Sequence, residues 1–171
     1  MRAQRGFTFI ELVTVIALLG IIAVVALPRL IGADAFGAEE VARQLIAGAR
    51  LAQQQAMAHT NGTVALDVAR DSTGYRYSVT LSDAGATQTL FSAQAKFANV
   101  NVNVVAGALN AAIAVGQALH FTFAPRSDLS AVTLGGTAGS INGGVALTVD
   151  GQRQSLLCVA ASGYAHRGNC L

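Results

Sequence analysis

Glu11 is the only ionisable residue between Phe7 and Leu27, a run otherwise made of apolar side chains, threonine and glycine. A carboxylate near the middle of a membrane-spanning helix costs about 2.5–3.5 kcal/mol, and less near its end. An amine and a carboxylate are each expensive alone in surroundings of low dielectric but tolerable together. We therefore expect Glu11 to meet a positively charged partner.

Other residues that could do chemistry are dispersed. His59, His120 and His166 have no metal-ligand spacing, and His120 alternates with apolar residues, so its side chain is expected to point outward from a strand. Asp67, Asp71 and Asp83 could together bind calcium, but aspartates around a hairpin are far more often turn formers. No serine elbow or paired carboxylates stand out. We expect no catalytic site, no metal and no cofactor.

The run that carries Glu11 would be about 32 Å long as a helix, at ~1.5 Å per residue. That length matches the ~30 Å hydrocarbon core of a bilayer. Arg2 and Arg5 lie on the short segment before it. Positive charge on this flank predicts a cytoplasmic N-terminus and export of the remainder of the chain.

The string Arg5-Gly6-Phe7-Thr8-Phe9-Ile10-Glu11-Leu12 resembles the cleavage and assembly signature of type IV prepilins and type II secretion pseudopilins. The resemblance implies that a prepilin peptidase cuts between Gly6 and Phe7, and that the new N-terminal Phe7 is N-methylated. It also implies that Glu11 pairs with the N-terminal amine of a neighbouring subunit in a filament. Pro28, just after the apolar run, fits the same family.

Two other interpretations of the segment remain. One is an ordinary secretory signal peptide cleaved after Val24-Val25-Ala26, although the apolar core of such a peptide is normally 7–15 residues long. The other is a simple membrane anchor in which Glu11 is incidental. Neither accounts for Gly6-Phe7 and Glu11 together, so we favour the prepilin.

The composition limits the net charge expected of the exported part of the chain. Loss of Arg2 and Arg5 would leave 9 of the 11 basic residues against 9 acidic ones, so the mature chain would have no net charge. The pI near 8.8 therefore gives no support for a generally basic surface.

In an exported chain Cys158 and Cys170 predict a disulfide; the alternatives are two free thiols or half a metal site with His166. A disulfide near the C-terminus also recurs among pilins.

Helical spacing extends from Ala33 to Met57, and one face would carry Val41, Leu45, Ala49, Ala52 and Ala56. Glu39 and Arg43 stand four apart in the order that favours an ion pair. Asp34 could cap this segment. Together, residues 7–58 predict one long helix, bent at Pro28.

From Thr63 the apolar period changes to two, as in Val64, Leu66 and Val68 or in Leu119, Phe121 and Phe123. Asp150-Gly151 is a two-residue hairpin signal. The pattern predicts an α+β fold, in which a long N-terminal helix packs on an antiparallel β-sheet head of one or two sheets, as in type IV pilins. The expected organisation is a leader at 1–6, a transmembrane and assembly helix at 7–28, and an amphipathic helix with a β-rich head at 29–171.

Nucleic-acid binding is an alternative function. Some related minor pilins bind DNA through basic residues near the C-terminus, where this chain offers Arg153, His166 and Arg167. Two or three phosphate contacts would give weak, salt-sensitive binding. Gly163-Tyr164-Ala165-His166-Arg167 departs from the arginine pattern of those proteins.

Segments of the chain resemble two particular branches of this family. Arg50–Met57 and Val64–Asp67 are similar to H-type minor pseudopilins of type II secretion, while Val25–Arg29 resembles mannose-sensitive haemagglutinin (MSHA) type pilins. We expect a minor pilin of an MSHA-like pilus, with a secretion pseudopilin as the alternative. The implied partners are other pilin or pseudopilin subunits, the prepilin peptidase/methyltransferase and an inner-membrane assembly platform. The implied location is the bacterial inner membrane, then the periplasm or a surface pilus.

Overall fold

The computed structural model describes residues 8–30 and 36–170, which fall into two compact units, Met1–Ala33 and Asp34–Leu171. We call the second unit the head. The expected transmembrane helix and the expected β-rich head fall in different units.

The first unit contains helix α1 (Phe9–Leu30). The helix continues through Pro28, so the proline does not end it. Within the described residues, neither helix is both long enough and apolar enough to cross a bilayer. Residues 31–35, over which one continuous helix was expected, lie outside the described residues.

The head begins with helix α2 (Gly37–Ala58). Its N-cap residue is Phe36, which makes no side-chain cap hydrogen bond, and Asp34, the expected cap, lies outside the described residues. The predicted apolar face is buried along its whole length, from Ala38 to Ala56. Small residues on this face permit close approach, because a Cβ at Gly48 would lie only 2.9 Å from the Leu66 side chain.

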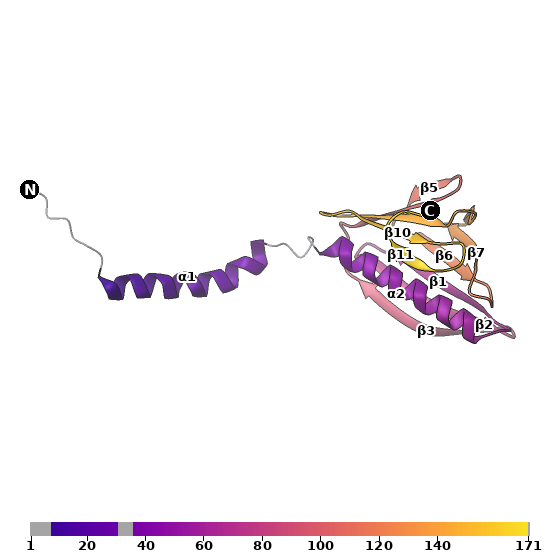
Figure 1. Ribbon diagram of the computed structural model, residues 1–171, viewed down its shortest axis with the longest axis horizontal. Coiled ribbons are helices and arrows are strands. Elements are labelled where there is room, and N and C mark those ends of the chain that lie inside the picture. The colour runs from indigo at the N-terminus through magenta and orange to yellow at the C-terminus, as the bar shows by residue number, and fades with distance from the viewer. Residues whose placement is uncertain (1–7, 31–35, 171) are drawn as a thin grey trace, which may run out of the picture. The chain divides into compact units, whose positions relative to one another are not determined.

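Two antiparallel sheets follow, and helix α2 contacts strands of both (Figure 1). The six-stranded first sheet has the order β3-β2-β1-β6-β7-β8. Its strands are β1 (Thr63–Arg70), β2 (Tyr75–Asp83), β3 (Ala86–Ala95), β6 (Ala118–Phe123), β7 (Leu129–Leu134) and β8 (Thr137–Gly139). The five-stranded second sheet has the order β11-β10-β9-β4-β5. Its strands are β4 (Asn101–Ala106), β5 (Leu109–Ala112), β9 (Val145–Asp150), β10 (Ser155–Val159) and β11 (Ala165–Arg167).

The hairpin between β9 and β10 corrects one expectation. Ser155 pairs with Val149, so the connection is longer than the two-residue turn predicted at Asp150-Gly151. Asp150 instead accepts hydrogen bonds from Asn103 Nδ2 (2.7 Å) and Gln154 Nε2 (2.8 Å). These side-chain bonds stabilise a wider loop than the dipeptide alone would favour.

The core of the head lies where α2 meets both sheets. Leu45 of α2, Leu66 and Phe121 of the first sheet, and Leu147 and Leu157 of the second line one hollow of only about 10 Å³. Because so little empty space remains, helix α2 fills the junction between the two sheets. Burial of this apolar surface is the main force that holds the three layers together.

Candidate functional site

Thr8 and Glu11 form a reciprocal pair at the start of α1. The Thr8 backbone N–H and Oγ1 lie 3.4 and 3.3 Å from Glu11 Oε2, and the Glu11 N–H lies 3.4 Å from Thr8 Oγ1. This arrangement is a capping box, in which a threonine at the N-cap and a glutamate three residues later satisfy backbone donors of the first turn. Glu11 therefore has a local partner within the chain.

Within the first unit, the described side chains of α1 are mostly apolar and exposed. Leu12, Ile16, Leu19 and Ile22 are 56–60% exposed. A contiguous apolar surface of this kind is typical of a segment that packs against lipid or another protein.

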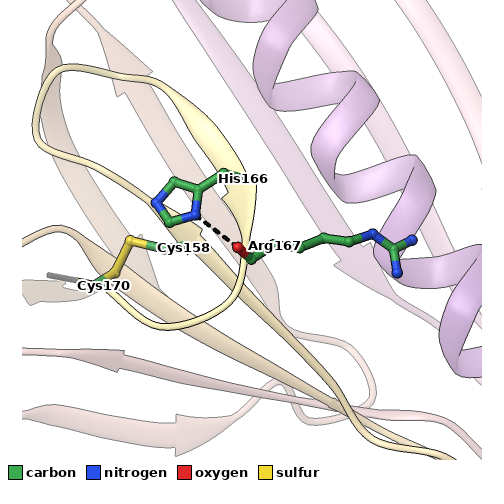
Figure 2. Close-up of a disulfide and its surroundings, with 4 residues drawn as sticks. All are labelled: Cys158, His166, Arg167 and Cys170. Atoms are coloured by element: carbon green, nitrogen blue, oxygen red, sulfur yellow. Dashed lines mark hydrogen bonds between the residues drawn. A yellow bond between two sulfur atoms is a disulfide. The ribbon is translucent and has the colours of Figure 1, made fainter.

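At the opposite end of the chain, a disulfide joins Cys158 of β10 to Cys170 across 12 positions (Figure 2). We call residues 158–170 the C-terminal clasp. The clasp contains β11, which pairs with β10. Figure 2 shows the Arg167 side chain extending from the clasp, away from the disulfide and toward α2.

The clasp is attached to α2 by three polar contacts. Both Nη atoms of Arg167 donate to the carboxylate of Glu39, with Nη1 at 2.9 Å from Oε2. Arg50 Nε donates to the Ala165 carbonyl at 3.1 Å, and Gln53 Nε2 donates to the Ser162 carbonyl at 3.0 Å. The C-terminal strand and the helix that precedes the sheets are thereby fixed to one another.

Glu39 forms an ion pair with Arg167, whereas the sequence predicted Arg43 as its partner. The hydrogen bond from Arg167 is the largest influence that lowers the pKa of the Glu39 carboxyl. Arg43 instead lies 3.9 Å from Glu40, on an exposed part of the helix. The bidentate tertiary contact has better geometry for a carboxylate than a pair along one helix.

Replacing Glu39 by glutamine should destabilise the chain by about 0.5–1 kcal/mol at neutral pH, because the pair is half exposed and screened. The lowered pKa means that this contribution is present above the ordinary carboxyl pKa of about 4.3 and disappears as the pH falls through the folded-state value. Melting temperatures of wild type and Glu39→Gln should therefore converge in acid. Glu40→Gln is the matched control, and a difference independent of pH would contradict the role of the charge.

Reduction of the disulfide should lower the melting temperature of the head. Closing a loop of this length stabilises a protein by about 3 kcal/mol in the chain-entropy model. The measurement is a thermal melt with and without reductant. The variant with alanine at both Cys158 and Cys170 should melt low in both conditions, and a wild type insensitive to confirmed reduction would refute a stabilising role.

The proposed nucleic-acid residues are distributed over two places. His166 and Arg167 lie on β11, and His166 Nδ1 is 2.9 Å from the Arg167 carbonyl. Arg153 lies in the loop between β9 and β10. The Arg167 guanidinium is already paired with Glu39. A role of these three residues in nucleic-acid binding stays a prediction.

The remaining histidines and aspartates make local contacts. His120 is exposed, as its place in the pattern predicts, and its Nδ1 contacts Asp67 on the neighbouring strand. Asp71 Oδ1 accepts hydrogen bonds from the Thr73 N–H (2.8 Å) and hydroxyl (2.6 Å), so this aspartate stabilises its turn. Among residues 8–30 and 36–170, no three His, Cys, Asp or Glu side chains gather at one point.

Residues 1–27 match the family model of the prokaryotic N-terminal methylation motif. No curated protein and no solved structure matches the chain. The motif suggests a type IV pilin-like precursor that is cut by a prepilin peptidase. It covers the N-terminal segment alone and does not bear on a minor or MSHA-type role.

Proposed function

We propose that this chain is a structural subunit of a type IV pilus, cut between Gly6 and Phe7 and N-methylated at Phe7. The observation that carries the proposal is the methylation motif over residues 1–27. It coincides with Gly6-Phe7 and with Glu11, the one carboxylate in the apolar run. The chain is then a substrate of the peptidase/methyltransferase and has no enzyme activity of its own.

The properties of each unit, taken separately, support this function. The exposed apolar side chains of α1 suit a stem helix that first lies in the inner membrane, with the N-terminus in the cytoplasm, and then packs with stem helices of other subunits. Residues 1–6 serve as the leader, and residues 7–28 serve as the membrane and assembly helix. Residues 29–171, which include the head, lie in the periplasm before assembly and at the pilus surface after it.

We place the subunit in an MSHA-like pilus, as a minor component, on two grounds. Val25–Arg29 resembles pilins of that type, and the C-terminal disulfide suits pilus proteins better than secretion proteins. An H-type minor pseudopilin of a type II secretion system is the alternative, supported by the similarity of Arg50–Met57 and Val64–Asp67 to that branch. Loss of surface pili without loss of secretion on deletion of the gene would favour the first role.

The experiment that tests the processing pathway is the intact mass and N-terminal sequence of the protein purified from native membranes. A chain that begins at N-methylated Phe7 is the expected result. A chain that begins after Ala26 would mean an ordinary signal peptide and would overturn the proposal, because the segment with Glu11 would then be absent from the mature protein.

Variants at Glu11 separate its local role from its proposed role between subunits. Glutamine can occupy the same place in a capping box but carries no charge. If Glu11 pairs with a neighbour's N-terminal amine, Glu11→Gln should assemble as poorly as Glu11→Ala, because leaving one buried charge unpaired costs about 3–5 kcal/mol.

The readout is the fraction of subunit in sheared filaments, with methylation of Phe7 followed by mass. Thr8→Ala is the matched control, because it removes the cap while the carboxylate remains, and it should still assemble. Wild-type incorporation of Glu11→Gln would mean that Glu11 acts only at the start of its own helix.

A further inference from the structure

One surface of the head gathers three arginines from two elements that are distant in the sequence. Arg43 and Arg50 of α2 and Arg167 of β11 line an open hollow of about 440 Å³. Its remaining lining residues, Ile46 and Ala47, are uncharged and form an apolar floor. Among the described residues, no carboxylate lines this hollow, although Glu39 pairs with Arg167 and Glu40 pairs with Arg43.

Arg50 is the best-positioned donor of the three. Its Nε–H is bound to the Ala165 carbonyl, and its guanidinium lies 5.4 Å from the centroid of the Tyr164 ring. Both contacts fix the plane of the guanidinium, while within the described residues no hydrogen bond or ion pair engages its Nη atoms. A guanidinium has five N–H donors in a rigid fork, so the Nη atoms of Arg50 are held in position to donate to a ligand.

The other two arginines retain donors as well. Arg43 is largely exposed and only 3.9 Å from Glu40, which makes it a weak surface pair. Arg167 uses its two Nη atoms on Glu39, but each of these atoms carries a second N–H. Three guanidinium groups against two carboxylates leave the surface with a net positive charge.

We propose that this hollow is a binding site for a phosphate group. Arginine forks match the oxygens of phosphate in bidentate geometry. A phosphate can accept from several guanidinium groups at once, whereas one carboxylate has only two oxygens. The site lies on the head and does not depend on the proposed pilus function, so either can fail without the other.

The test uses the purified full chain in detergent at low salt, with two probes. Inorganic pyrophosphate measures the phosphate site alone, and a short single-stranded oligonucleotide measures phosphates carried on a nucleic-acid backbone. Arg50→Gln should weaken binding about tenfold or more, as expected for the loss of a charge-assisted hydrogen bond. Arg43→Gln should weaken it as well, and this variant removes no contact with the clasp.

Arg126→Gln is the matched control, because it removes the same charge from an exposed loop outside the hollow. It should bind both probes like wild type. With three arginines, oligonucleotide binding should fall with salt at a logarithmic slope of about −2. Pyrophosphate binding alone identifies a small phosphate ester as the source, and tighter oligonucleotide binding identifies a nucleic acid.

Equal affinities of wild type, Arg43→Gln and Arg50→Gln would overturn the site, as would failure of both probes to bind wild type at low salt. If Arg126→Gln lost binding while Arg50→Gln kept it, the proposed site would likewise be refuted, and the anion would be assigned to the β6–β7 loop. A thermal melt of each variant accompanies the titrations. Arg50→Lys, which keeps the charge but loses the fork, should retain part of the affinity.

Discussion

Replacing Gly6 by valine should leave the chain uncut and unmethylated, with its N-terminus at Met1. Glycine has no side chain, so a protease can closely approach the peptide bond that follows it, and a branched side chain would obstruct that approach. The uncut chain would retain Arg2 and Arg5, and it would lack the free amine of Phe7 that Glu11 is proposed to meet. We therefore expect complete loss of filament incorporation.

The measurement is intact mass of the variant from native membranes, beside the yield of sheared filaments. Gly20→Ala is the matched control, because a Cβ at Gly20 meets nothing within 4 Å in the described chain. It should be cut and methylated normally. Normal cutting of Gly6→Val between residues 6 and 7 would contradict the assignment of the cleavage site.

Replacing Phe121 by alanine should have the largest effect on the stability of the head. The side chain is fully buried and lines the same small hollow as Leu45 of α2 and Leu147 of the second sheet, at the junction of three layers. Removing a buried phenylalanine side chain typically costs about 3–5 kcal/mol, because apolar burial is lost and a cavity remains. Few single substitutions reach that range.

Urea unfolding of the full chain in detergent, followed by circular dichroism, measures this loss. Phe121→Leu should be affected less, since it keeps most of the apolar contact. Thr122→Ala, on the opposite face of the same strand, should remain close to wild type. Equal midpoints for Phe121→Ala and Thr122→Ala would show that the junction is not the centre of stability.

Much of the head was predictable from short-range patterns. The face of α2 with Val41, Leu45 and Ala49 is buried, and the alternation of Leu119, Phe121 and Phe123 gives the buried face of β6. These predictions succeed because the periods of helix and strand place residues on one face by local geometry alone. The α+β class follows from the same periods.

Pairing between strands was not predictable in this way. β1 pairs with β6, although β2, β3, β4 and β5 intervene in the sequence, and the strands divide into two sheets. Alternation tells which face of a strand is apolar but not which neighbour it will have. That choice depends on how all the faces are buried together.

The contrast between the two ends of the chain has a physical cause. The order of residues at Gly6, Phe7 and Glu11 determined the proposed processing and assembly role, since a peptidase acts on a short local string, and the matched motif lies within residues 1–27. The Glu39–Arg167 pair, whose members are 128 positions apart, and the arginine hollow were decided only by the tertiary structure. A charge four residues away on a helix is near by local geometry, whereas β11 meets α2 only because the second sheet packs against that helix.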